Sequence, residues 1–319
     1  MKVAICTTTI NGVTEAMGKF IAIAEDRDWD VIVAGDTITP GDVWREAEVA
    51  HPCVTYLDLG QQRHLAQELS DLIGPRCIQR RNFAMLAAAR RDDVDVVAVV
   101  DDDNIPYPSW GKNLAVGCEV PVIQYPAVVA FDPLSVTRNR HVFQETPLRH
   151  RGFPVQLWRP EPEVTSMIPL VQADLWDGEP DVDAITRMVG GGELDMRYEG
   201  RSFFTGSVPG PFNSQNTFLH RSVLPYYFLF PDVGRMDDIW ASYVMQKLVP
   251  NSVIYGPPSV EQVRNPHDLS KDLMNEVLGY QHTLDLITWL KDHNPLTDEW
   301  PEWMPESALY AWELWRDAL

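Results

Sequence analysis

Three consecutive carboxylates at the end of an apolar segment are the residues of this chain best placed to do chemistry. Asp101, Asp102 and Asp103 follow Val96–Val100, where all five residues are apolar and four are β-branched. Such a segment is typical of a strand buried on both faces of a mainly parallel sheet. Open α/β sheets bind ligands at the carboxyl ends of their strands, and adjacent acids repel one another unless a cation lies among them. We therefore expect a divalent metal that holds a diphosphate; the alternatives are a solvated loop or a helix cap.

The elements that must position these acids alternate between strands and helices. In the first third of the chain, strands are expected at residues 3–9, 31–34, 54–57 and 96–100, and helices at residues 14–25 and 79–91. This order predicts a parallel, doubly wound α/β sheet.

The rest of the chain is less regular. Residues 104–180 are rich in proline, which removes a backbone donor and predicts loops and edge strands. A helix is expected from Asp238 to Leu248, capped by Asp237 or a neighbour. The C-terminal segment is helical and aromatic, and the helical spacing of its apolar residues indicates core packing in preference to a base-stacking platform.

A helix that begins with an arginine and an asparagine precedes the acidic strand. Arg81 and Asn82, followed by the strand and its acids, resemble the nucleotide-sugar-binding half of the GT-A glycosyltransferases, in which such a pair begins the helix before the metal-binding strand. The resemblance implies a GT-A-like fold over residues 1–265, with a mainly parallel sheet flanked by helices, and a helical, aromatic-rich extension over residues 266–319. It also implies that both residues contact the nucleotide.

Polar residues at the ends of the first two strands are expected to complete the nucleotide site. Thr7, Thr8, Thr9 and Asp36 are placed to meet the base and the ribose. Arg81 can neutralise a phosphate or contact the base with its planar fork. Threonine is also common in strands, so the three threonines have a purely structural alternative.

Two further motifs narrow the resemblance. Residues 234–241, Gly-Arg-Met-Asp-Asp-Ile-Trp-Ala, are similar to the Gly-Arg-x-Asp-Asp-x-Trp-Ala motif of the reversibly glycosylated polypeptides. Residues 151–154, Arg-Gly-Phe-Pro, are similar to the Arg-Gly-Tyr-Pro motif of the same family. These proteins are UDP-arabinopyranose mutases that do not use flavin. The chain resembles the actinobacterial branch, GDP-sugar mutases of a nucleoside-antibiotic pathway, more than the plant branch.

The resemblance implies that a metal takes part in the reaction. Asp101 and Asp103 are expected to bind Mn²⁺ or Mg²⁺, which favour oxygen ligands and stabilise a leaving diphosphate. Asp102 is expected to contact the ribose. His267 is a candidate third ligand, with a surface or helix-capping histidine as the alternative. No Gly-x-Gly-x-x-Gly follows the first strand, so neither flavin nor NAD is expected.

The implied reaction interconverts the pyranose and furanose forms of a nucleoside-diphosphate sugar linked to GDP or UDP. Asp237 and Asp238 are expected to stabilise an oxocarbenium-like sugar or to deprotonate the ring-closing hydroxyl, unless one of them only caps the helix. Arg151 and Arg159 are expected to clamp the diphosphate, although the family arginine that Arg151 matches is a sugar-accepting position. A retaining glycosyltransferase with a separate acceptor is the second hypothesis. A self-glycosylating or sugar-nucleotide-binding scaffold is the third.

Composition limits the partners. A formal net charge of −20 disfavours nucleic acid and anionic membranes. The four cysteines lack a Cys-x-x-Cys spacing, which favours reduced thiols, and no signal peptide or membrane-length apolar segment is visible. We therefore expect a cytoplasmic protein that binds a nucleoside-diphosphate sugar. The aromatic C-terminal helices are a plausible surface for a homo-oligomer.

Overall fold

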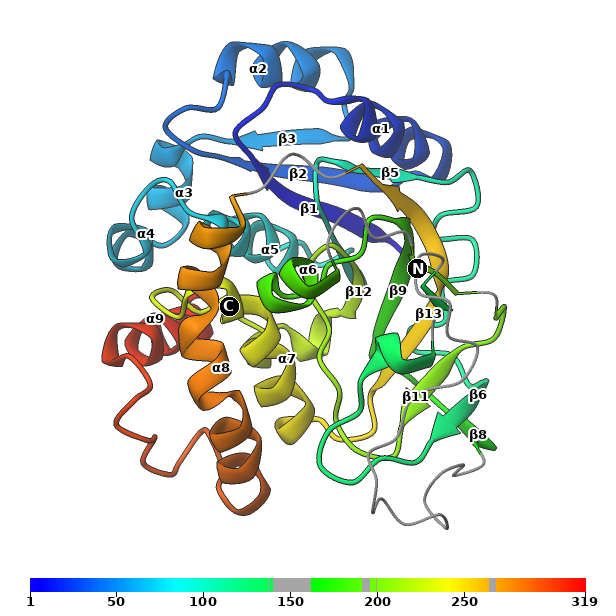
Figure 1. Ribbon diagram of the computed structural model, residues 1–319. Helices are drawn as coiled ribbons and strands as arrows, with labels where there is room; N and C mark the ends of the chain where they lie inside the picture. The colour runs from blue at the N-terminus through cyan, green and yellow to red at the C-terminus, as the bar shows by residue number, and fades with distance from the viewer. Residues whose placement is uncertain (137, 140–161, 191–195, 199, 264–267) are drawn as a thin grey trace.

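The structure is a computed structural model that describes residues 1–136, 138–139, 162–190, 196–198, 200–263 and 268–319. Its strands join one sheet (Figure 1). They are β1 (Val3–Thr9), β2 (Asp30–Gly35), β3 (Val54–Leu57), β4 (Val96–Val100), β5 (Asn104–Pro106), β6 (Val120–Tyr125), β7 (Arg138–Asn139), β8 (Glu163–Met167), β9 (Val171–Gly178), β10 (Met196–Arg197), β11 (Phe204–Gly206), β12 (Asn216–His220) and β13 (Val253–Gln262). The helices are α1 (Glu15–Arg27), α2 (Gly41–Ala50), α3 (Leu59–Leu65), α4 (Gln67–Ile73), α5 (Arg81–Ala89), α6 (Ala184–Gly190), α7 (Asp237–Leu248), α8 (Leu269–Asp292) and α9 (Glu306–Ala318).

The sheet has a parallel half and a mixed half. The strand order is β3-β2-β1-β4-β12-β9-β13-β11-β6-β8. The first four strands run parallel to one another, whereas β12 is antiparallel to both of its neighbours, β4 and β9. The predicted α/β fold is confirmed, with parallel pairing concentrated in the strands nearest the N-terminus.

Helices cover both faces of the parallel half. In β1, Val3 and Ile5 pack in one core cluster with residues of α1, while Ala4 and Cys6 pack in another with residues of α5. Figure 1 shows α1 and α2 on one side of these strands and α5 on the other. Since β1 and β4 are covered on both faces, β4 and the first four residues of β1 are continuously apolar instead of alternating.

The proline-rich region contains a strand that the sequence analysis did not expect. β9 lies between β12 and β13 in the middle of the sheet, so the prediction of loops and edge strands is wrong there. The reason is local: β9 begins after Pro169 and contains no proline, and its first five residues, 171–175, are buried. Proline is frequent over the whole region, so its average content gave no sign of this eight-residue central strand.

The C-terminal helices pack on the same core as the sheet. The indole rings of Trp312 and Trp315 in α9 are buried, and their N–H groups donate to the carbonyls of Pro225 and Leu224 at 3.1 and 2.9 Å. The aromatic stripe is therefore a packing surface, as its spacing predicted.

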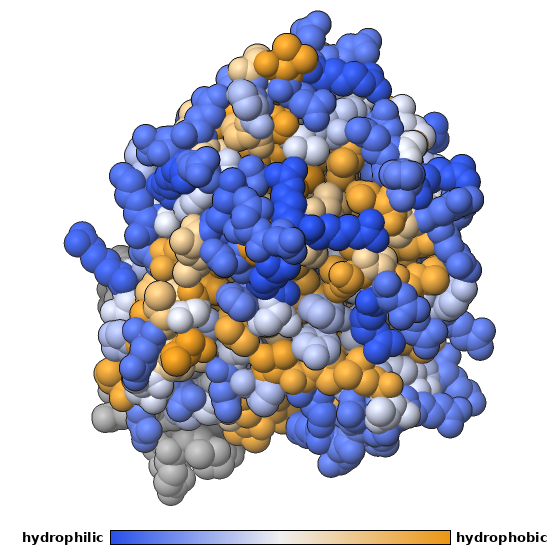
Figure 2. Space-filling model, turned by 180° about the vertical axis from the view of Figure 1, so that it is seen from behind, coloured by the Kyte–Doolittle hydropathy of each residue, from blue (hydrophilic) through white to orange (hydrophobic). Residues whose placement is uncertain are grey.

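The surface mixes polar and apolar residues. On the face seen in Figure 2, hydrophilic residues surround apolar ones, which lie near the top and across the centre and lower part. Within the described residues, no helix combines the length and apolar character needed to span a membrane.

Candidate functional site

A cavity of about 330 Å³ lies at the carboxyl end of β4 and collects acids from distant segments. Its charged lining consists of Asp101, Asp103, Asp181, Asp237, Asp238, Arg81 and Arg235. We call it the acid cavity. Five aspartates there accompany two arginines, and such an excess of carboxylates is stable only with a cation or with protonation.

Arg81, the first residue of α5, joins two groups of acids. Its guanidinium is buried, and Nη1 donates to the carbonyl and hydroxyl oxygens of Ser214 at 2.8 and 2.7 Å, while Nη2 donates to Asp101 Oδ1. Ser214 in turn donates its N–H and its hydroxyl to Asp238 Oδ2, each at 2.8 Å. Burial by itself would lower the pKa of Arg81, but the charge and hydrogen bond of Asp101 together with the charge of Asp238 outweigh burial and raise it. We call Asp101, Arg81, Ser214 and Asp238 the Arg81 bridge.

Asp101 and Asp103 are the residues that would hold a divalent metal. Both line the acid cavity, and carboxylate oxygens are the donors that Mg²⁺ and Mn²⁺ prefer. Among the described residues, no three His, Cys, Asp or Glu side chains form a metal-binding group. Two carboxylates are sufficient where substrate phosphates and water supply the other ligands, which is the usual arrangement for Mg²⁺. The donor set thus fits a metal that binds together with a diphosphate.

Asp237 and Asp238 occupy the first turn of α7, but neither side chain caps it. The N-cap residue is Met236, and it makes no side-chain capping bond. Gln79 Nε2 donates to Asp237 Oδ2 at 3.0 Å, and Ser214 binds Asp238. The cap position therefore falls on a neighbour of Asp237, as predicted, but no side chain caps the helix, because the carboxylates of Asp237 and Asp238 bind other segments.

Burial raises the pKa of both acids. The pKa of Asp237 lies well above its usual range, and the charge of Asp238 raises it further. Burial raises the pKa of Asp238 to about 6, with hydrogen bonds from Ser214 acting in the opposite direction. Two neighbouring carboxyl groups with different proton affinities can act as proton donor and acceptor near neutral pH.

Arg235 brings a second positive charge to the cavity wall. Its Nε donates to Glu276 at 3.0 Å and its Nη1 to Asp272 at 3.4 Å, both on α8, and Nη2 lies 3.8 Å from Asp181. These contacts fix the segment before α7 against α8. Arg235 thus helps to set the position of Asp237 as well as the charge of the cavity.

Asp102 ties the turn after β4 to the loop after β1. Its carboxylate accepts hydrogen bonds from Thr9 and, at 3.1 Å, from Asn11 Nδ2, and its carbonyl accepts one from Thr14 at 2.6 Å. The structure thereby brings together Thr9 and Asp102, two of the predicted nucleotide-binding residues.

Other predicted nucleotide-site residues bind the protein's own backbone. Thr7 and Thr8 are buried, and Thr8 donates to the Ala34 carbonyl at 2.7 Å. The amide of Asn82 exchanges two hydrogen bonds with the backbone of Leu229, at 3.0 and 3.1 Å. In the structure these side chains position β1, β2 and α5.

Asp36 holds the segment that leads to α5. Its carboxylate accepts hydrogen bonds from the backbone N–H groups of Thr37, Arg76 and Cys77. The bond from Arg76 measures 2.6 Å. Asp36 therefore affects the site indirectly. It positions the segment before α5, and Arg81 is the first residue of that helix.

Three predicted site residues, Arg151, Arg159 and His267, lie outside the described residues. Two further residues, Ser214 and Gln79, bind the two acids of α7 and were not predicted from the sequence. Ser214 is 133 residues from Arg81 and stands in no motif, so no sequence signal points to it.

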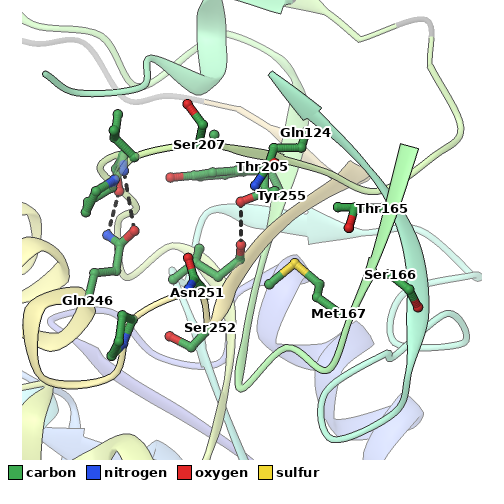
Figure 3. Close-up of a pocket in the computed structure, with 16 residues that line it drawn as sticks. Gln124, Thr165, Ser166, Met167, Thr205, Ser207, Gln246, Asn251, Ser252 and Tyr255 are labelled. Carbon is green, nitrogen blue, oxygen red and sulfur yellow. Dashed lines mark hydrogen bonds between the residues drawn. The ribbon is translucent and has the colours of Figure 1, made fainter. Parts of the chain in front are cut away.

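A second hollow, of about 320 Å³, lies among β6, β8, β11 and the loop after α7 (Figure 3). None of its lining residues in the described part of the chain is charged, and none is a predicted site residue. Two of its polar side chains already bind backbone: Gln246 Nε2 donates to Gly210 at 2.7 Å and Thr205 donates to Val253 at 2.9 Å. The acid cavity is therefore the candidate site.

Comparison with known proteins gives a likeness of structure only. No protein-family model matches the sequence, and no curated protein matches it. A glucosyl-3-phosphoglycerate synthase from Mycobacterium tuberculosis, solved with Mn²⁺, UDP-glucose and phosphoglyceric acid, aligns with 12% identity over 89% of this chain and 78% of that chain, at a TM-score of 0.47. A mannosyl-3-phosphoglycerate synthase from Rubrobacter xylanophilus aligns with 12% identity over 96% of this chain and 79% of that one, at a TM-score of 0.45. The function proposed below depends on the site residues and not on these alignments.

Proposed function

We propose that this chain is a metal-dependent enzyme of nucleoside-diphosphate sugars and that it interconverts their pyranose and furanose forms. The observation that carries the proposal is the Arg81 bridge, which connects an acid after β4 with an acid of α7 at the wall of one cavity. Acids for a metal and acids for proton transfer are the two sets of groups that such a reaction requires.

The diphosphate belongs at the end of β4 in this proposal. Asp101 and Asp103 would hold the metal, which would supply positive charge for the leaving diphosphate. Arg81 fixes the orientation of Asp101 through its buried ion pair. Arg235 lines the same cavity and adds positive charge against the diphosphate.

In the same proposal, Asp237 and Asp238 of α7 act on the sugar. When the anomeric C–O bond breaks, the diphosphate takes the electron pair and the sugar gains oxocarbenium character, which a nearby carboxylate stabilises. The pKa of about 6 leaves Asp238 mostly ionised at pH 7, so it can accept the proton of the hydroxyl that closes the new ring. Asp237, whose pKa burial raises well above its usual range, can return a proton to the ring oxygen that is released. The diphosphate then re-forms its bond to the anomeric carbon.

A glycosyltransferase is the second candidate. A neighbouring cavity of about 510 Å³ shares Asp181 and Arg235 with the acid cavity. It offers room for a separate acceptor, which a mutase does not need.

One experiment separates the candidates. The protein is incubated with Mn²⁺ and either UDP-linked or GDP-linked pyranose sugars, without acceptor, and the products are separated by chromatography. A ring isomer with an unchanged nucleotide supports the mutase. Slow hydrolysis without isomer favours the transferase, and binding without any product favours a scaffold. Asp238→Asn should abolish the isomer, whereas Asp42→Asn, at an exposed position of α2, should not.

A further inference from the structure

A small chamber adjoins the acid cavity and contains an acid that the proposed mechanism does not use. It has a volume of about 90 Å³ and shares Asp181 with the acid cavity. Asp174, in the central strand β9, lines it and is 2% exposed. The other walls are largely apolar, with Leu175, Phe212 and Ile239 among them.

The two oxygen atoms of the Asp174 carboxyl group differ in their hydrogen bonding. Gln172 Nε2 donates to Oδ1 at 2.8 Å, and the nearby Ser259 side chain also favours the ionised form, whereas Oδ2 has no hydrogen bond of normal geometry among the described residues. Buried polar atoms in folded proteins almost always have such a partner, so an acceptor that lacks one and lines a cavity indicates a group supplied from outside the chain. Burial raises the pKa of Asp174 to about 7, so the group can both donate and accept a hydrogen bond near neutral pH.

The backbone around Asp174 leaves space for this carboxyl group. Asp174 pairs with Gly256 of β13, and a Cβ atom at Gly256 would lie 1.8 Å from Asp174 Oδ1. Any larger residue at position 256 would displace the carboxyl group. The sheet is thus built to keep an acid at this place.

We propose that the chamber receives the hydroxylated end of the sugar and that Asp174 hydrogen-bonds one of its hydroxyl groups. This inference rests on the proposed function, because it places the diphosphate in the acid cavity and the sugar beyond Asp181. Apolar walls with a few polar groups are typical of ligand sites. The walls contact the C–H faces of the ligand, and the polar groups determine its orientation. Asp174 is then a specificity-determining residue for the sugar and makes no contact with the nucleotide.

The test compares a nucleotide with the same nucleotide carrying a sugar. Affinities for UDP, UDP-galactose, GDP and GDP-mannose are measured by calorimetry with Mn²⁺ present, for the wild type and Asp174→Asn. The wild type should bind at least one sugar nucleotide more tightly than its parent diphosphate. Asp174→Asn should weaken that sugar nucleotide about tenfold and leave the diphosphate within about twofold. Asp177→Asn, on the same strand but outside the chamber lining, is the matched control and should behave like the wild type.

The outcomes are distinct. If Asp174→Asn lowers neither affinity, or if the sugar adds no affinity in the wild type, the chamber holds only water and the inference is overturned while the proposed function stands. If the wild type binds no diphosphate, the proposed function itself fails. Leu134→Trp, which fills the chamber without changing an acid, should reproduce the loss even if Asp174→Asn does not fold. Unchanged sugar affinity in Leu134→Trp would also overturn the inference.

Discussion

Arg81 and Asp101 form an ion pair in which the arginine side chain is 2% exposed and the aspartate side chain 22% exposed. The guanidinium of Arg81 is therefore buried in contacts within the protein, while the carboxylate of Asp101 still lines the acid cavity. Because the same guanidinium also binds Ser214, the position of the metal-binding acid and that of Asp238 depend on one another.

Arg81→Lys should uncouple these two acids. A lysine keeps the charge but lacks the planar fork, so one ammonium group cannot replace the bonds to both Asp101 and Ser214. We expect the free energy of unfolding to fall by about 2 kcal/mol and Mn²⁺ binding to weaken, measured by urea denaturation and calorimetry. Arg76→Lys, at an exposed position nearby, should change neither. Wild-type values for Arg81→Lys would refute the bridge.

Asp101→Asn and Asp103→Asn should each weaken the binding of Mn²⁺ in the presence of UDP by about tenfold or more, because each removes a charged oxygen ligand. Titration followed by the electron paramagnetic resonance signal of free Mn²⁺ measures this directly. Chelation with EDTA should likewise remove the thermal stabilisation by UDP-sugar, and added Mn²⁺ should restore it. If thermal stabilisation by UDP-sugar persists in EDTA, the metal has no part in binding.

Asp174→Asn should change how stability depends on pH. In the folded protein Asp174 keeps its proton up to about pH 7, whereas the unfolded chain releases it near pH 3.8. A folded-state pKa above the unfolded value means that stability is greatest at low pH and is lost as pH rises between these values. The wild type should therefore lose about 4 kcal/mol relative to the asparagine variant between pH 4 and pH 8.

The measurement is the difference in unfolding free energy between the two proteins at each pH. All other titrating groups are common to both, so the difference isolates position 174. A difference that does not vary with pH would show that Asp174 is ionised throughout.

Gly234→Ala should disturb the start of α7. Gly234 has φ +64°, and a Cβ atom there would lie 2.1 Å from the carbonyl oxygen of Asn275 in α8. We expect a loss of about 2 kcal/mol or more and weaker sugar-nucleotide binding, because Arg235 and Asp237 follow directly. Gly18→Ala is the matched control: it lies inside α1 with no atom within 4 Å of the new Cβ, so stability should rise by up to about 1 kcal/mol. Equal effects of the two substitutions would contradict this account.

The sequence predicted the parallel half of the fold because that half follows local rules. The apolar segment Val96–Val100 is a buried strand, and Thr14 caps the first helix where the pattern placed its start. Proline content over residues 104–180 did not predict β9, because it describes an average over the region and β9 contains no proline. Partners of individual side chains, such as the backbone of Leu229 for Asn82, have no local signal.

By itself, the sequence determined which residues carry charge at the carboxyl end of β4 and at the start of α7. Strand and helix periodicity are properties of neighbouring residues, so Asp101 and Asp238 could be found without a structure. Only the tertiary structure decided that Arg81 and Ser214 join these acids and that Asp174 faces a chamber beside them. These relations depend on the packing of segments as far as 133 residues apart, because burial and the loss of water determine which polar groups pair and which acids keep a proton.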